Sequence, residues 1–363
     1  MKYSFVIPTY NNAKLLLNTL EALNHMRVPE GCEFEVNIVD DGSDIDTLGY
    51  ISNLPKKYSM DYQYVERCAD SSRARARNYG IRKATGDVVV FIDADIIVCP
   101  NYLEELERYF RNDRNCIVIG TRILLQKDVT LQEVQDGRIF RKDIQEQKGA
   151  REEFRKKVLE DLSYNASNIH YPCLYCQTCN LAVPREKLML CNGFDEDLKK
   201  WGVEDVEMAY RVIQNDTRVV INSRNIVMHQ FHGIVEEIDV KQELINDVDY
   251  NADIFIRKHH GAFGLDDFGI KELFRSIAGR YGDIEHREPE AANKITLEFR
   301  DEKYLSEIQD IISKLIIYEQ LEIIVIDYNE KTDLDVWIQN LACRKGALKY
   351  FPASRVDLEN IAS

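Results

Sequence analysis

Along its first hundred residues the chain alternates between strand-like and helix-like patterns of apolar positions. The run "YSFVIPTY" predicts a buried strand that stops near Pro8, and leucines at helical spacing follow it. Two further strands are predicted in "FEVNIVDDGSD" and "YQYVE". A predicted helix in "SSRARARNYGIRKATG" then leads to a fourth strand at Val88–Ile92. Strands that alternate with helices predict a parallel, doubly wound α/β sheet, which binds ligands beyond the carboxyl ends of its strands.

The remainder of the chain shows a less regular pattern. From about Asn101 to Ser167 we expect charged and mostly helical structure. Beyond it, "TRVVINSRNIVMHQFH" predicts another strand, and a charged helical tail continues to about Tyr281.

A late segment resembles the opening strand, helix and strand of the same chain. When "IIVIDYN" is laid on "VNIVDDG", apolar helix positions also coincide. Two interpretations stay open: a degenerate partial repeat of residues 1–75, or a periodicity that any two such units share. The corresponding positions are Ile308 with Leu16, Ile312 with Leu20, Leu315 with Leu23, and Tyr328 with Asp41.

Charge and composition narrow the range of partners. The 363 residues include 47 Lys and Arg against 62 Asp and Glu, a net charge of −15, so nucleic acid is a poor partner and an anionic membrane only slightly better. The N-terminus lacks the pattern of a signal peptide, and no apolar run reaches the length of a membrane span. We expect a cytoplasmic protein, with peripheral association at the inner face of the membrane left open. Whether the chain is part of a longer protein, and its oligomeric state, are left open as well.

Two aspartates interrupt the most apolar stretch, "VVVFIDADIIVCP". Ionised Asp93 and Asp95 are costly to bury unless they are paired or bind a cation. Because Mg²⁺ or Mn²⁺ commonly joins carboxylates to phosphates, a strand end with two carboxylates indicates a metal site. A second acidic strand end, at Asp40 and Asp41, strengthens this interpretation. The alternative is that the pair only caps the following turn.

Four segments together resemble the nucleotide-sugar glycosyltransferases of family 2. They are "FVIPTYNN", "IVDDGSD", "ARNYGIRKATGDVVVFIDAD" and "NGFDEDLKKWGVEDVEMAYRV", and they occur in the family's order over about residues 1–233. The resemblance implies the GT-A fold, a Rossmann-like and mostly parallel sheet flanked by helices. It divides the chain into a nucleotide-binding half (1–100), an acceptor and catalytic half with the helical tail (101–285), and a small α/β extension (286–363). The Gly that usually precedes the Ala-Arg-Asn element is absent from "CADSSRA", which puts that loop's shape in doubt.

The same resemblance implies a set of donor-binding residues. Asp41 matches the carboxylate that accepts hydrogen bonds from uracil, and Asp93 matches the ribose contact. Arg73 matches more loosely as a diphosphate contact, and its alternative is a solvated helix face. The full set of expected nucleotide-binding residues is Pro8, Thr9, Tyr10, Asp41, Arg73, Arg77, Asn78, Asp93 and Ala94.

The stretch "WGVEDVEMAYR" resembles the Trp-Gly-x-Glu-Asp element of family 2 enzymes and of galactosyl- and N-acetylgalactosaminyltransferases. It implies Asp205 as the base that takes the acceptor proton and Glu204 as a ligand of sugar hydroxyls. Trp201 and Gly202 would contact a sugar. The alternative is that the two acids only favour the N-terminus of a helix and that Trp201 belongs to the core.

Two histidines and four cysteines are further metal-ligand candidates. The resemblance implies a His after the last core strand as a ligand beside Asp95, with His229 as first choice and His232 as second. Either His could instead be structural. The cysteine spacing is compatible with a zinc or iron–sulfur site, yet ordinary reduced thiols explain it better. These cysteines are Cys173, Cys176, Cys179 and Cys191.

Together these patterns predict a metal-dependent, inverting glycosyltransferase that uses Mn²⁺ or Mg²⁺. The donor is a UDP-sugar of the galactose, glucose or N-acetylhexosamine type, and the acceptor is a glycan, a lipid-linked sugar or a peptide. Two alternatives are a non-catalytic module that binds sugar nucleotides and a phosphohydrolase of the haloacid-dehalogenase type. The sequence names neither the sugar nor the acceptor, because acceptor pockets are built from variable loops.

Overall fold

The computed structural model describes residues 1–162, 164–233, 242–278, 293–318, 321–342 and 348–355. The chain divides into two compact units. The first contains Met1–Arg155 and Cys173–Ile284, and the second contains Lys156–Pro172 and Glu285–Ser363. No helix in these described ranges is both long and apolar enough to cross a membrane.

A mixed, largely parallel sheet forms the centre of the first unit. Its strand order is β3-β2-β1-β4-β8-β6-β9-β5, with β7 beside β6. The four strands at the β3 end are parallel, whereas β8 is antiparallel to both β4 and β6. The predicted α/β fold, with a largely parallel sheet flanked by helices, is therefore confirmed. The strands are β1 (Lys2–Thr9), β2 (Glu33–Asp40), β3 (Ser59–Tyr64), β4 (Val88–Phe91), β5 (Ile96–Val98), β6 (Cys116–Leu124), β7 (Arg151–Glu152), β8 (Leu181–Pro184) and β9 (Arg218–His229).

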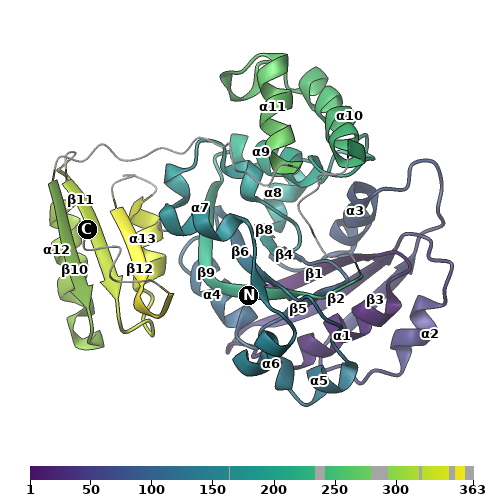
Figure 1. Ribbon diagram of the computed structural model, residues 1–363, viewed down its shortest axis with the longest axis horizontal. Coiled ribbons are helices and arrows are strands. Elements are labelled where there is room, and N and C mark those ends of the chain that lie inside the picture. The colour runs from purple at the N-terminus through teal and green to yellow at the C-terminus, as the bar shows by residue number, and fades with distance from the viewer. Residues whose placement is uncertain (163, 234–241, 279–292, 319–320, 343–347, 356–363) are drawn as a thin grey trace. The chain divides into compact units, whose positions relative to one another are not determined.

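Helices cover both faces of this sheet (Figure 1). One face carries α1, which packs against β5, and the opposite face carries α3, which packs against β1 and β2. The helices that begin in this unit are α1 (Ala13–Asn24), α2 (Thr47–Ser52), α3 (Arg73–Lys83), α4 (Tyr102–Phe110), α5 (Leu131–Gln135), α6 (Lys142–Gln147), α7 (Arg155–Asp161), α8 (Arg185–Leu190), α9 (Glu204–Gln214), α10 (Gln242–Lys258) and α11 (Asp267–Ala278).

The strand order predicts a ligand-binding crevice at the carboxyl end of β1. The chain passes from β1 to β2 and β3 on one side and then returns to β4 on the other, so the direction of winding reverses at β1. Helix α3 approaches β1 closely because Gly80 has no side chain; a Cβ there would lie 2.4 Å from Val6 Cγ1. The loops that follow β1, β2 and β4 therefore meet at one edge of the sheet.

The expectation for residues 101–167 was wrong in one respect. The segment contains β6, a mostly buried strand that pairs with β8 and β9. Its apolar part, "CIVIG", is short and follows the charged "RNDRN", so the charge of the surrounding segment concealed it.

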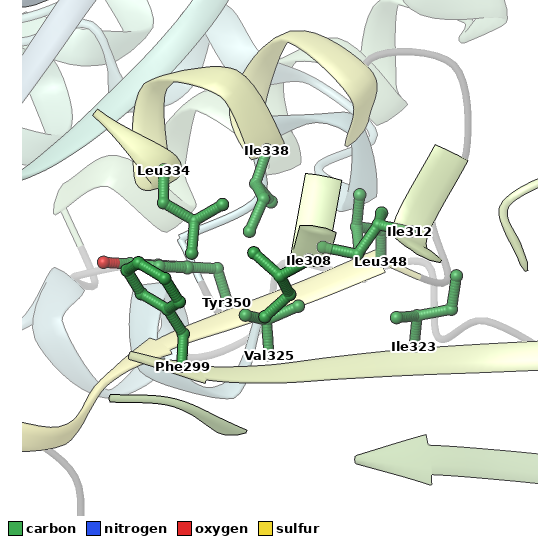
Figure 2. Close-up of a cluster of buried hydrophobic side chains, with 9 residues drawn as sticks. All are labelled: Phe299, Ile308, Ile312, Ile323, Val325, Leu334, Ile338, Leu348 and Tyr350. Carbon is green, nitrogen blue, oxygen red and sulfur yellow. The ribbon is translucent and has the colours of Figure 1, made fainter. Parts of the chain in front are cut away.

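The second unit has its own three-stranded parallel sheet in the order β10-β11-β12. Helices α12 and α13 both contribute to a single apolar core on one face of it (Figure 2). The elements are β10 (Asn293–Phe299), α12 (Leu305–Leu315), β11 (Leu321–Asp327), α13 (Leu334–Ala342) and β12 (Leu348–Pro352). The buried core residues are Phe299, Ile308, Ile312, Ile323, Val325, Leu334, Ile338, Leu348 and Tyr350.

Candidate functional site

The two aspartates of "FIDAD" lie on a turn between β4 and β5 at the crevice. Thr19 Oγ1 of α1 donates to Ala94 O at 2.8 Å, and Gln230 N of the segment after β9 donates to Asp95 O at 2.9 Å. Ala94 itself is buried. These bonds hold the turn from two sides, so the carboxylates of Asp93 and Asp95 extend from a fixed backbone.

Asp95, His229 and His232 come together as one group. One ligand atom from each lies within 4.8 Å of the others, and Asp95 Oδ2 is 3.5 Å from His229 Nε2. The antiparallel pairing of Ile96 with His229 produces this approach. Burial, reinforced by the charge of Asp93, raises the pKa of Asp95 to about 7. Among the described residues Asp95 Oδ1 is buried without a hydrogen-bond partner, and a bound cation would satisfy it.

A buried glutamine supports this group from behind. Gln230 is fully buried, and its Nε2 donates to Leu15 O of α1 at 3.1 Å. Its Oε1 accepts from Asn18 Nδ2 at 2.8 Å. Helix α1 therefore fixes the segment that carries both histidines. A small pocket lies beside the group, lined by Leu124, Leu125, Gln126, His229, Gln230, Phe231 and His232.

Thr9, the last residue of β1, and Asp41, directly after β2, lie side by side at the other end of the crevice. Asp41 N donates to Thr9 O at 2.9 Å. Both Thr9 Oγ1 and Asp41 Oδ1 are buried and make no hydrogen bond with the described residues. Burial raises the pKa of Asp41, and Ser71, Arg67 and Arg75 oppose the shift. Two buried oxygens without partners form a site that a polar ligand can satisfy.

An arginine that the sequence did not indicate, Arg67, contacts both Asp41 and the Tyr10 ring. Arg67 Nη1 lies 3.3 Å from Asp41 Oδ2, and the Arg67 guanidinium lies 4.0 Å from the centre of the exposed Tyr10 ring. Arg67 belongs to an irregular loop after β3, where no periodicity reveals a contact. Pro8 is half-buried at the end of β1, and Arg73 is exposed in the first turn of α3.

Arg77 and Asn78 of α3 point into the protein and connect the site's segments. Arg77 is buried; its Nη2 lies 3.3 Å from Asp93 Oδ1 and its Nη1 lies 3.0 Å from Glu204 Oε1. Asn78 exchanges two hydrogen bonds with the backbone of Phe194, at 2.8 and 2.9 Å. One helix thus joins the turn after β4 to the "NGFDED" and "WGVED" segments.

The "WGVED" segment makes an uncommon turn into α9. Gly202 and Val203 both have positive φ, +81° and +75°, and Val203 is buried. A β-branched residue seldom adopts this conformation, which costs about 1–2 kcal/mol. Asn251 Nδ2 donates to Gly202 O at 2.6 Å and helps to hold the turn. The half-buried Trp201 precedes this turn. The backbone N of Trp201 lies 3.4 Å from Asp247 Oδ2.

Glu204 and Asp205 begin α9 and differ in their surroundings. Glu204 Oε1 binds Arg77, whereas Glu204 Oε2 is buried without a hydrogen-bond partner in the described part of the chain. Asp205 is half-buried, and Asp205 Oδ1 accepts from Val206 N at 2.9 Å. Loss of hydration, and then the charge of Glu204, raises the pKa of Asp205 to about 7. A carboxylate with that pKa can accept a proton near neutral pH.

The four cysteines do not form a metal group within the described ranges. Among the described residues, the side chains that cluster closely enough to hold a metal ion are those of Asp95, His229 and His232. Burial raises the pKa of Cys173 to about 12 and that of Cys179 to about 11, so both thiols are protonated at neutral pH. Cys176 is also buried and Cys191 is half-buried, and neither forms a disulfide with the described residues.

Comparison with known proteins identifies relatives of this chain. Residues 4–167 match glycosyl transferase family 2, and residues 161–232 match the N-terminal domain of galactosyltransferase. Validoxylamine A glucosyltransferase of Streptomyces hygroscopicus is 25% identical over 301 residues, 78% of this chain and 65% of that protein. Chondroitin synthase of Escherichia coli is 29% identical over 226 residues, 58% of this chain and 32% of that protein. The chain thus spans less than two thirds of either relative.

A solved structure shares the fold. S. aureus TarS 1–349 in complex with UDP-GlcNAc has a TM-score of 0.50 with this chain at 16% identity. The match covers 77% of this chain and 72% of that one.

Proposed function

We propose that the chain is a glycosyltransferase of family 2, whose model matches residues 4–167, and that it transfers a hexose or N-acetylhexosamine from a UDP-sugar to an acceptor hydroxyl, with inversion and with a divalent cation. The convergence of Asp95, His229 and His232 beside Asp93 carries the proposal. A glucosyltransferase among the relatives supports a hexose as the sugar. The sugar within this class and the acceptor, whether glycan, lipid-linked sugar or peptide, are for experiment to identify.

The chemistry of the three side chains favours Mn²⁺ over Mg²⁺. One carboxylate and two imidazoles suit a first-row transition ion, whereas Mg²⁺ prefers oxygen ligands. Asp95 Oδ1, buried without a partner among the described residues, fits a cation ligand. A cation held here supplies positive charge to the diphosphate of a bound donor.

Thr9 and Asp41 are the proposed contacts for the uracil base of the donor nucleotide. Asp41 is an acceptor when ionised, so it can take a hydrogen bond from an N–H of uracil, and Tyr10 offers a ring for stacking. Asp93 is the proposed ribose contact. In this assignment Arg77 and Asn78 position the site from beneath instead of binding donor atoms, because both terminal guanidinium nitrogens of Arg77 and the side-chain amide of Asn78 bind protein groups.

Asp205 is the proposed general base of the transfer reaction. Its carboxylate accepts the acceptor hydroxyl proton while that oxygen attacks the anomeric carbon, and the bond from carbon to the diphosphate oxygen breaks. Glu204 Oε2 is available to hold a sugar hydroxyl, and Trp201 provides an apolar surface for a sugar ring. The N-terminal half of the first unit would then bind donor and its later half would bind acceptor.

A donor screen tests the proposal. Purified full-length chain is incubated with each UDP-hexose, each UDP-N-acetylhexosamine and the GDP-sugars, with mixed acceptors, and released nucleotide is measured. We expect release of UDP with Mn²⁺, loss of activity with EDTA and recovery when Mn²⁺ is restored. The Asp205→Asn variant should bind UDP normally and release none from the sugar donor.

Other outcomes would support different functions. Mn²⁺-dependent UDP binding without turnover for any donor indicates a non-catalytic sugar-nucleotide module. Hydrolysis of phosphomonoesters that Asp93→Asn abolishes indicates a phosphohydrolase. Preference for GDP-sugars would overturn the assignment of Asp41.

A further inference from the structure

The buried Arg155 and the half-buried Arg122 share one carboxylate in the first unit. Arg155 donates from Nε to Glu153 Oε2 and from Nη2 to Glu153 Oε1, each at 2.8 Å. Arg122 Nε lies 3.4 Å from Glu153 Oε2, and Arg122 N donates to Glu153 Oε1 at 2.9 Å. The side chains of Glu153 and Arg155 are each 1% exposed. Two guanidinium groups and one carboxylate give this Arg122 cluster (Arg122, Glu153 and Arg155) an excess of positive charge in a poorly hydrated place.

The register of the sheet brings the cluster next to the metal-ligand candidates. In the parallel pair of β6 and β9, Arg122 is opposite Val227 and Leu124 is opposite His229. Because side chains alternate along a strand, Arg122 and His229 lie on the same face. Two residues of rise and one strand spacing separate their Cα atoms by about 8 Å, within reach of an arginine side chain.

The two arginines have different roles within the cluster. Besides Glu153, Arg155 donates to Tyr175 O at 2.7 Å and to Gly120 O at 3.2 Å, so its donors are directed into the protein. Arg122 contacts a weak acceptor, Cys179 Sγ, at 3.6 Å, and its guanidinium lies 5.6 Å from the Phe154 ring centre. Of the two arginines, Arg122 is the one that the strand register places on the same face as His229.

A donor diphosphate needs positive charge, and three other arginines around the site are less suited to supply it. Arg77 is already shared by Asp93 and Glu204, Arg67 lies at the Asp41 end, and Arg73 is exposed. The carboxylates of Asp93 and Asp95 offset the charge of one divalent cation. We infer that Arg122 binds the diphosphate of the nucleotide-sugar donor, and that Glu153 and Arg155 are positioning residues for it. This inference rests on the proposed function of the same site.

Calorimetry with three probes tests the inference. UDP, UMP and uridine are titrated into the full chain and into Arg122→Met, Arg122→Lys and Arg141→Met at a fixed Mn²⁺ concentration. Arg141 is the matched control, because it is exposed and pairs with the nearby Asp143. Loss of a hydrogen bond to a charged group predicts UDP binding weakened about 10- to 100-fold in Arg122→Met, with a smaller effect on UMP. Uridine binding should stay unchanged, Arg122→Lys should recover part of the UDP affinity, and Arg141→Met should match the unmodified chain.

The outcomes separate this inference from the proposed function. If Arg122→Met binds UDP as the unmodified chain does, the inference is overturned and the function stands. Equal weakening for UDP and uridine also overturns it, because that pattern indicates a general structural effect. If the unmodified chain binds no UDP, the proposed function fails and the inference fails with it. Should Arg122→Met not fold, Arg122→Lys decides: unchanged UDP affinity contradicts a forked phosphate contact, and a selective loss for UDP supports it.

Discussion

Arg77 and Glu204, 127 positions apart in the sequence, form a buried ion pair with 3.0 Å between Nη1 and Oε1. Removing one partner of a buried pair leaves the other charge without compensation. We therefore expect Arg77→Met to lower the free energy of unfolding of the first unit by about 3–5 kcal/mol. Urea unfolding followed by Trp201 fluorescence in a Trp337→Phe background measures the first unit alone, because the chain has 2 tryptophans, one in each unit.

The control for this prediction is Arg82→Met on the same helix. Arg82 is exposed, and its Nη1 lies 3.8 Å from Glu196 Oε1, so its loss should cost less than about 1 kcal/mol. Equal midpoints for the two variants would show that the buried pair contributes little to stability.

The raised pKa of Asp205 predicts that activity rises and stability falls as the pH increases toward 7. With a pKa near 7, its deprotonated fraction falls about tenfold per pH unit below 7, so kcat/KM at saturating Mn²⁺ should rise toward pH 7 and level off above it. Asp205→Asn should lower kcat by about 10²-fold or more at every pH. A variant with full activity would remove Asp205 from the role of base.

The same shift has a defined sign for stability. The pKa of Asp205 is raised from 3.8 in the unfolded chain, so the folded state retains the proton longer, and stability is lost as pH rises from 3.8 through about 7. Asp205→Asn should therefore have a higher Tm than the unmodified chain above pH 7 and a similar Tm near pH 4. For comparison, the bond to Lys199 lowers the pKa of the exposed Asp70, so Asp70→Asn should show no gain above pH 7. Equal Tm differences at both pH values for Asp205→Asn would contradict the shift.

Gly193 is expected to tolerate no side chain. Its φ is +67°, and a Cβ would lie 2.3 Å from Asn78 Oδ1, the atom that accepts from Phe194 N. Gly261 is the matched control, with φ +72° and nothing within 4 Å of its Cβ position. Gly261→Ala should cost about 1–2 kcal/mol for the left-handed backbone alone. Gly193→Ala should cost about 1–3 kcal/mol more, since it also disrupts a buried hydrogen bond. Similar unfolding midpoints in urea for both variants would contradict this close approach.

The periodicity of the sequence was sufficient to place the acidic strand ends. Asp41, Asp93 and Asp95 follow apolar runs, and a doubly wound sheet brings such ends to one edge. His229 and His232 were proposed through the family resemblance, and the structure brings both to Asp95. These positions depend on local pattern and on strand order, which the pattern largely determines.

Contacts made across the fold were beyond reach of the same reasoning. Arg67 reaches Asp41 from an irregular loop, and Arg122 lies on β6, a strand that the sequence did not reveal. Gln230 is buried beneath α1, where a polar residue in an apolar context shows no partner until the strands are assembled. Such contacts join segments up to about two hundred residues apart, and no local periodicity encodes them.

The first of the two interpretations of the late segment, a degenerate partial repeat, is consistent with one side-chain pair in each unit. Tyr62 donates to Asp40 Oδ2 at 2.7 Å, and Tyr350 donates to Asp327 Oδ2 at 2.8 Å. In both units the Tyr is two residues before the strand position opposite the Asp. The other carboxylate oxygen accepts from the backbone N–H three residues on, of Ser43 or Glu330.

This correspondence predicts equivalent structural roles for the two tyrosines and different functional ones. Tyr62→Phe and Tyr350→Phe should each lower the stability of their own unit by about 1–3 kcal/mol, because each leaves a buried carboxylate oxygen with one donor fewer. Trp201 reports the first unit in a Trp337→Phe background, and Trp337 reports the second in a Trp201→Phe background. UDP affinity should be unchanged in Tyr350→Phe, because Tyr328 replaces Asp41 in the second unit and stacks with Arg300 at 3.7 Å. Tyr350→Phe could leave the second unit as stable as before while Tyr62→Phe destabilises the first. The two units would then share a topology but not a stabilising Tyr–Asp hydrogen bond, and the repeat would lose its side-chain support.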